Sequence, residues 1–154
     1  MRILFVCTGN TCRSPMAEGI MRKLVADRGL RIEVRSAGVA ASTGASMSRH
    51  AEAVLRDKGI VDKFASTQLH SEQVEWADLI LTLTESHKQH IRFAFPTSLD
   101  KVYTLKEYVS DGSGMAESYD ISDPYGGSRD DYDRTAEEIA AALDKLADKL
   151  GGQA

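Results

Sequence analysis

The sequence is poor in the features that define several classes of protein. Its 154 residues include only two Cys, three Pro and 6% aromatic residues. Two cysteines are too few for a disulfide framework, and no apolar run reaches the length of a transmembrane helix. The 19 basic and 23 acidic residues give a formal net charge of −4, and no basic block stands out. We therefore expect neither a nucleic-acid partner nor a membrane partner.

The apolar content of the chain is typical of a globular protein. Apolar residues make up 42% of the chain, enough for a core that needs no metal or disulfide to hold it. We therefore expect one domain over residues 1–154. The sequence opens on an apolar strand pattern and not on a secretory leader with a cleavage site, which predicts a cytoplasmic protein.

Strand and helix patterns alternate along the chain. Apolar or alternating runs predict strands at residues 3–6, 32–38, 79–83 and 101–104. Helical periodicity and end signals predict helices at residues 15–25, 51–57, 71–76, 86–93 and 130–150. This alternation predicts a three-layer α/β sandwich with a doubly wound sheet of about four parallel strands. In such folds ligands bind beyond the carboxyl ends of the strands, beside the first one.

The most informative segment is Val-Cys-Thr-Gly-Asn-Thr-Cys-Arg-Ser-Pro at residues 6–15, directly after the first strand. Ser14 is a preferred N-cap, and Pro15 fits the first position of a helix. The N–H groups of the loop and of the helix N-terminus would then converge on one point. That convergence is typical of a phosphate site.

The residue types in this loop indicate nucleophilic chemistry. A helix N-terminus and the neighbouring Arg13 favour the thiolate form of Cys7, which is the nucleophile. The planar guanidinium of Arg13 matches two phosphoryl oxygens. Gly9 permits close backbone approach or a positive φ, and Asn10 tolerates the left-handed region. Ser14 either caps the helix or stabilises the Cys7 thiolate, and the sequence does not separate these roles.

A second candidate segment lies in the long polar connection over residues 110–128, since long loops are often functional. Release of a leaving group from phosphate requires a proton, which a carboxylic acid can supply before acting as base for water. Asp123, restrained by Pro124, is the candidate. From the residues alone, the nearby Asp120 stays open as the alternative.

Two motifs together resemble the low-molecular-weight protein tyrosine phosphatase family: Cys-x5-Arg-Ser at residues 7–14 and Asp-Pro-Tyr at residues 123–125. The resemblance covers essentially the whole chain and implies a flavodoxin-like fold. It implies a phosphocysteine intermediate on Cys7 and favours Asp123 over Asp120 as acid and then base. It also implies phosphorylated proteins as partners, inorganic phosphate as product, and no metal or other cofactor.

The resemblance also implies that the loop backbone and Arg13 hold the phosphoryl group. The implied binding residues of the loop are Thr8, Gly9, Asn10, Thr11, Cys12 and Ser14. We expect Cys12 to act mainly as a small packed side chain. A transient disulfide between Cys7 and Cys12 is the alternative use of the second thiol.

Departures from the eukaryotic-type pattern bear on the substrate. That pattern has an aliphatic residue in place of Thr11 and a second aromatic in place of Gly126. The loop, together with residues 36–38 and 105–109, is most similar to the bacterial protein arginine phosphatase branch. This resemblance implies hydrolysis of protein phosphoarginine, with the Thr11 position as the substrate filter. We expect Tyr125 to form one wall of the entrance. A protein tyrosine phosphatase is the alternative.

Three other functions fit the sequence less well. A thiol-dependent arsenate reductase needs further cysteines, which the chain lacks. A cysteine phosphocarrier should avoid hydrolysis, which Arg13 and Asp123 would promote. A non-catalytic binder of phosphoproteins has no use for the nucleophile.

The sequence contains one closely spaced pair of histidines on a predicted helix. His87 and His90 are three residues apart on a predicted helix, a spacing that a metal could use. No third ligand accompanies them in the sequence, so we expect a solvated helix face.

Overall fold

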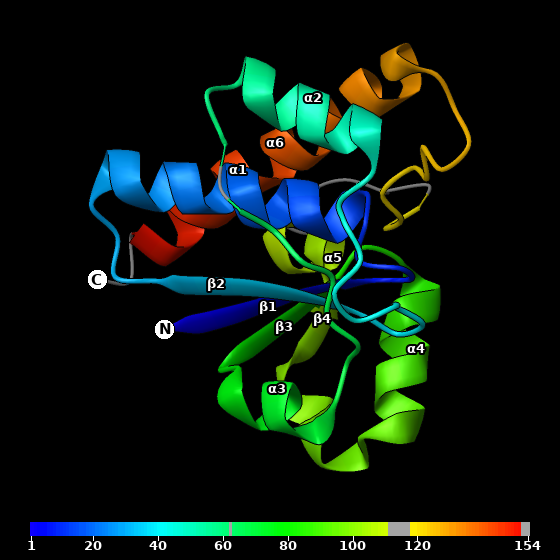
Figure 1. Cartoon of the computed structure of the whole chain (residues 1–154). Helices are drawn as coiled ribbons and strands as arrows, with labels where there is room; N and C mark the ends of the chain where they lie inside the picture. Colours follow the sequence, from blue (N-terminus) through cyan, green and yellow to red (C-terminus); the bar gives the residue numbers. More distant parts are fainter. Residues whose placement is uncertain (62, 111–117, 152–154) are drawn as a thin grey trace.

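The computed structural model describes residues 1–61, 63–110 and 118–151. The chain alternates between strands and helices from its first residues onward (Figure 1). The elements are β1 (Arg2–Cys7), α1 (Arg13–Arg28), β2 (Glu33–Gly38), α2 (Arg49–Asp57), α3 (Ser71–Trp76), β3 (Leu79–Thr82), α4 (Glu85–Ala94), the 3-10 helix η1 (Pro96–Lys101), β4 (Val102–Thr104), α5 (Leu105–Val109) and α6 (Arg129–Gly151).

The predicted four-stranded parallel sheet is confirmed. Its strand order is β2-β1-β3-β4, and each neighbouring pair is parallel. The chain places β2 on one side of β1 and β3 on the other, so the direction of winding reverses at β1. Ligand sites of doubly wound sheets lie at the carboxyl end of the strands at such a reversal. The loop after Cys7 therefore starts at the expected position.

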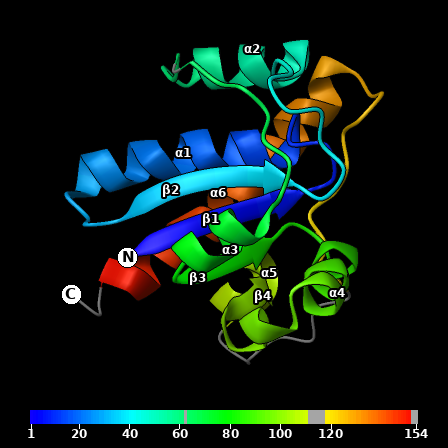
Figure 2. The same ribbon diagram turned by 60° about the horizontal axis from the view of Figure 1, so that its bottom comes forward.

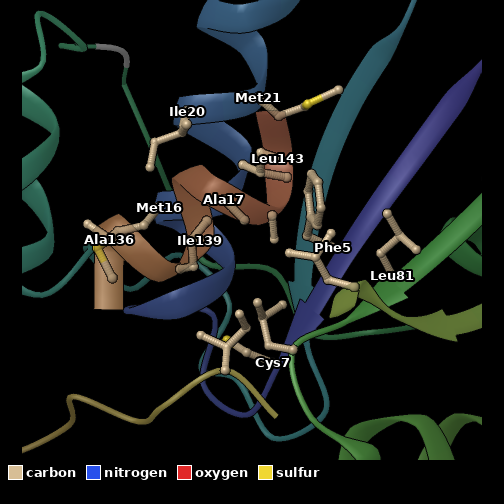
Figure 3. Close-up of a cluster of buried hydrophobic side chains, with 14 of the residues drawn as sticks. Phe5, Cys7, Met16, Ala17, Ile20, Met21, Leu81, Ala136, Ile139 and Leu143 are labelled. Atoms are coloured by element: carbon tan, nitrogen blue, oxygen red, sulfur yellow. The ribbon is translucent and has the colours of Figure 1, made fainter. Parts of the chain in front are cut away.

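Two apolar layers cover the sheet, because successive residues of a strand point to opposite faces. Ile3, Phe5 and Cys7 of β1 belong to the larger core cluster, which also contains residues of α1, α2 and α6 (Figure 3). Leu4 and Val6 belong to a second cluster with residues of α3 and α4. Figures 1 and 2 show the same arrangement, with α1 and α6 on one face and α3 and α4 on the other.

Several details differ from the sequence-based prediction. Neither η1 nor the five-residue helix α5 was expected. Helix α1 begins at Arg13, two residues earlier than expected. Part of the predicted 110–128 connection, residues 111–117, lies outside the described residues, and residues 118–128 contain no helix or strand. Within the described part of the chain, no helix combines the length and apolar character needed to cross a bilayer.

Candidate active site

The loop of residues 8–12 connects the carboxyl end of β1 to α1 and packs tightly against the end of β2. Gly38, the last residue of β2, pairs with Cys7 in the sheet. A Cβ added at Gly38 would lie 2.5 Å from the Thr8 carbonyl oxygen and 2.9 Å from the Asn10 nitrogen. Only glycine leaves room for the loop at this distance. The path of the phosphate loop thus depends on a residue of another strand.

Asn10 fixes the conformation of this loop. It has a φ of 56°, in the left-handed region, and its side chain is fully buried. Its side-chain oxygen accepts a hydrogen bond from the Thr67 N–H at 2.9 Å. Its Nδ2 donates to Ser14 Oγ at 2.7 Å and to Ser36 Oγ at 2.9 Å. The expected positive φ therefore falls on Asn10, while Gly9 is not among the residues with positive φ.

The Ser14 hydroxyl is directed at the nucleophile. Ser14 Oγ lies 2.8 Å from Cys7 Sγ. Because the same oxygen accepts a hydrogen bond from Asn10, the hydroxyl proton is left to be donated to the sulfur. The prediction that Ser14 is the N-cap is wrong: the N-cap of α1 is Cys12, without a side-chain capping bond. Of its two suggested roles, the geometry favours stabilisation of the Cys7 thiolate.

The network behind Ser14 extends into the sheet and α1. Ser36 Oγ, which accepts from Asn10, donates to Glu18 Oε1 at 3.0 Å. Glu18 Oε2 lies 3.3 Å from an Arg22 guanidinium nitrogen. Ser36 was not predicted from the sequence to belong to this network. A serine at the end of a buried strand is a weak signal by itself, although a buried hydroxyl does require a partner.

Arg13 connects the phosphate loop to the segment that carries Asp123. Its side chain is almost fully buried, and Nη1 donates to the Ile121 carbonyl oxygen at 3.0 Å. The Ile121 N–H donates to the Leu83 carbonyl oxygen at 2.8 Å. Arg13 Nη2 lies 3.6 Å from Asp123 Oδ2, and the Asp123 side chain is 58% exposed. The two hydrogen bonds of the Ile121 backbone therefore bring a solvent-accessible carboxylate to the phosphate loop.

Asp120 and Asp123 have different surroundings. Asp120 Oδ1 accepts a hydrogen bond from the Glu85 N–H at 2.8 Å, in the first turn of α4. Asp123 Oδ1 accepts from the Tyr125 N–H at 3.0 Å, while its other oxygen faces Arg13. Asp120 thus satisfies an N–H at a helix N-terminus, and Asp123 is the carboxylate beside Arg13. This geometry supports the choice of Asp123.

Glu138 of α6 holds the residue next to Asp123. Ser122 Oγ donates to Glu138 Oε2 at 2.7 Å, and Lys106 of α5 pairs with Oε1 of the same carboxylate. Burial by itself would raise the pKa of Glu138, but the hydrogen bonds from Lys106 and Ser122 outweigh it and lower the pKa. The Asp123 segment is thus anchored to α4 on one side and to α6 on the other.

His87 is part of the site, and the prediction that it lies on a solvated face is wrong. Its side chain is buried, and Nε2 lies 2.8 Å from Thr8 Oγ1. Burial and then the positive charge of Arg13 lower the pKa of His87 to about 4, so its ring is neutral at pH 7. His90 is exposed, as expected. The described residues contain no group of three or more His, Cys, Asp or Glu that could hold a metal.

The remaining predicted residues line or support the loop. Cys12 is buried in the core cluster, as expected, and its Sγ lies 3.3 Å from the Tyr132 hydroxyl. Thr11 is partly exposed, and its carbonyl oxygen accepts a hydrogen bond from the Ser48 N–H at 2.9 Å. Tyr125 is 80% exposed. Because it is exposed and lies two residues after Asp123, its ring can contact the part of a substrate that stays outside the loop.

Taken together, the strand, loop and helix present a buried thiol, a fixed guanidinium and a nearby carboxylate, which define a cysteine-dependent phosphatase site. The sequence pattern of the family described as low molecular weight phosphotyrosine protein phosphatase matches residues 2–154. The chain belongs to this family.

Within the family, the chain is similar to several proteins that are named arginine phosphatases. The protein-arginine-phosphatase of Bacillus subtilis strain 168 is 46% identical over 150 residues, which cover 97% of each chain. The protein-arginine-phosphatase of Geobacillus stearothermophilus is 44% identical over 97% of this chain and 95% of its own. A solved structure of YwlE arginine phosphatase, a C7S mutant with a phosphorylated active-site serine, is 45% identical with a TM-score of 0.91. That match covers 98% of this chain and 96% of the solved one.

Proposed function

We propose that this protein is a protein arginine phosphatase, one domain that hydrolyses phosphoarginine on proteins through a phosphocysteine intermediate. The observation that carries the proposal is the convergence of Cys7, Arg13 and Asp123 at the carboxyl end of β1. The choice of phosphoarginine is supported by two relatives of that name at 44% and 46% identity, and by the hydroxyl of Thr11.

In the first step the Cys7 thiolate attacks the phosphorus of the substrate. An S–P bond forms while the bond from phosphorus to the guanidinium nitrogen breaks. The leaving nitrogen takes its proton from the Asp123 carboxyl group. Arg13 and the N–H groups of the loop bind the phosphoryl oxygens, where charge develops during transfer. The product arginine leaves, and the phosphoryl group stays on Cys7.

In the second step water attacks the phosphocysteine. Asp123, now a carboxylate, accepts a proton from the water, and the S–P bond breaks to release inorganic phosphate. Cys7 leaves as a thiolate, and the Ser14 hydroxyl at 2.8 Å donates a hydrogen bond to it. No step requires a metal or another cofactor. The reaction needs Cys7 as a free thiol, which fits a reducing cytoplasm.

Thr11 and Asp123 provide the proposed preference for arginine. A phosphorylated guanidinium carries N–H donors around its phosphorus, whereas the bridging oxygen of phosphotyrosine carries none. The Thr11 hydroxyl and the carbonyl oxygen of the Asp123 carboxyl group can accept hydrogen bonds from these donors. An aliphatic side chain in place of Thr11 would leave the donors unpaired, which disfavours phosphoarginine.

The test is to compare kcat/KM for two peptides of the same sequence, one with phosphoarginine and one with phosphotyrosine. The proposal predicts that phosphoarginine is hydrolysed at least about tenfold more efficiently, the value of one good hydrogen bond to a charged group. A preference for phosphotyrosine would establish the alternative, a protein tyrosine phosphatase of the same family.

A further inference from the structure

Thr8, the residue after the nucleophile, is exposed, and its hydroxyl is hydrogen-bonded to the buried His87. Thr8 follows Cys7 directly and lies at the exposed rim of the phosphate loop. Its Oγ1 lies 2.8 Å from Nε2 of His87, a residue of α4 79 positions further along the chain. A rotating surface hydroxyl is thereby fixed in one direction, which costs conformational freedom. A hydroxyl fixed in this way can take part in catalysis together with Asp123.

The His87 ring is well placed to hold this hydroxyl. The ring is 5% exposed, and within the described residues its other nitrogen, Nδ1, has no hydrogen-bond partner. Thr8 is thus the one hydrogen-bond contact recorded for the imidazole in this part of the chain. The backbone N–H of His87 donates to the Thr84 side chain at 3.2 Å, which fixes the first turn of α4.

The pair also lies beside the two charges of the reaction. Arg13, Asp120, Asp123 and His90 all act electrostatically on the His87 ring, and the ring stays neutral at pH 7 because its pKa is about 4. A neutral ring adds no cation that would compete with Arg13 for the phosphoryl oxygens. The ring that holds the Thr8 hydroxyl is thus close enough to Arg13 and Asp123 to feel both charges.

The second chemical step needs such a group. Water attacks phosphorus through an oxygen lone pair, and its two protons must point away from phosphorus. Asp123 accepts one of them. A fixed acceptor for the other would hold the water in line with the S–P bond, and orientation of this kind accelerates reactions strongly. Whichever ring nitrogen of His87 carries the proton, the Thr8 oxygen keeps at least one lone pair for that purpose.

We propose that Thr8, held in place by His87, binds the water that hydrolyses the phosphocysteine. This inference rests on the proposed phosphatase function and assigns a further catalytic residue and a positioning residue to it. Water donates one hydrogen bond to Thr8 Oγ1 and transfers its other proton to Asp123. The O–P bond forms as the S–P bond breaks, Cys7 leaves with the electron pair, and inorganic phosphate departs.

Single-turnover kinetics with enzyme in excess over p-nitrophenyl phosphate separates the two steps. Release of nitrophenol times the formation of the S–P bond, and release of inorganic phosphate times its hydrolysis. For Thr8→Val and for His87→Leu we expect phosphate release to slow about tenfold, while nitrophenol release keeps the rate of the parent protein.

Conservative variants distinguish a hydrogen bond from a structural role. Thr8→Ser keeps the hydroxyl, and His87→Gln keeps a polar group that can reach it, so both should hydrolyse the intermediate at nearly the parental rate. His90→Leu removes an exposed histidine one turn along the same helix and serves as the matched control. Thermal unfolding of every variant separates lost folding from lost chemistry.

Two results would overturn the inference. If both products are released more slowly and to the same extent, the pair supports the loop as a whole and not the water. If neither release changes in Thr8→Val, the hydroxyl has no part in hydrolysis. Failure of the proposed function looks different: the parent protein itself would then release no nitrophenol and form no phosphocysteine.

Discussion

The hydroxyl of Ser14 lies 2.8 Å from the sulfur of Cys7, and the Asn10 amide holds that hydroxyl from its other side. The amide is itself fixed by Thr67 and Ser36. The sulfur therefore meets a donor whose direction is set before any substrate binds. Such preorganisation stabilises a thiolate both as the attacking nucleophile and as the leaving group of the second step.

Replacement of Ser14 tests this arrangement. Hydrogen bonds to charged groups contribute about 1.5–3 kcal/mol, so Ser14→Ala should lower kcat about 10-fold to 100-fold. Ser36→Ala breaks the network two hydrogen bonds further from the sulfur and should have a smaller effect. The measurement is steady-state kinetics with p-nitrophenyl phosphate, together with thermal unfolding. An equal loss in the two variants would mean that the network acts through folding of the loop.

The two aspartates of the 118–128 segment form a matched pair. Asp123→Asn removes the proposed acid and base and should lower kcat on phosphopeptides about 100-fold or more, since general acid–base catalysis contributes about 10²–10⁴-fold. Asp120→Asn alters the hydrogen bond to the Glu85 N–H and removes a charge near His87, and it should leave most of the activity. If Asp120→Asn were the more damaging change, the assignment of the acid would be reversed.

Thr11 is the proposed determinant of substrate choice. In Thr11→Ile the hydroxyl is lost and the side chain becomes apolar, which suits a phenyl ring better than a guanidinium. The ratio of kcat/KM for phosphoarginine to kcat/KM for phosphotyrosine should fall about tenfold or more. Thr11→Ser, which keeps the hydroxyl, is the control and should keep most of the preference. An unchanged ratio in Thr11→Ile would remove Thr11 from the account of specificity.

His87 makes stability depend on pH. Its pKa is about 4 in the folded protein and 6.5 in an ordinary environment, so the unfolded chain binds its proton first as the pH falls. Stability from the neutral ring is therefore complete above pH 6.5 and is lost between about pH 6.5 and 4. The loss amounts to about 2 kcal/mol by pH 5.

Urea unfolding at pH 7 and pH 5 measures this effect. The parent protein should lose more free energy of unfolding than His87→Gln over this interval, because glutamine does not titrate. The carboxylates of Glu107 and Glu138, which also have lowered pKa values, are present in both proteins and cancel in the difference. An identical pH dependence in the two proteins would show that His87 is not held neutral.

The sequence was sufficient to predict what depends on local pattern. The apolar runs predicted all four strands, and the strand-loop-helix order placed Cys7 at the ligand-binding end of the sheet. Asp-Pro in a polar connection was also recognisable. Ser14, by contrast, was predicted from its neighbours to be an N-cap. Helix α1 begins at Arg13 instead, and the Ser14 hydroxyl is hydrogen-bonded to Cys7 and Asn10.

Contacts between distant segments could not be predicted from the sequence. His87 lies in a polar stretch of α4, and its ring is hydrogen-bonded to Thr8, which lies 79 residues away in the sequence. The Arg13 guanidinium donates to the backbone carbonyl of Ile121, so the identity of residue 121 does not indicate this bond. Ser36 and Gly38 matter because the loop backbone packs on the end of β2.

The proposed mechanism requires Cys7 to carry the phosphoryl group during turnover. Rapid acid quenching of the protein with a phosphoarginine peptide, followed by mass spectrometry of its fragments, detects this intermediate. We expect phosphate on Cys7, within the fragment that contains residues 6–15, and no turnover in Cys7→Ser. Phosphate on any other side chain, or a Cys7→Ser protein as active as its parent, would contradict it.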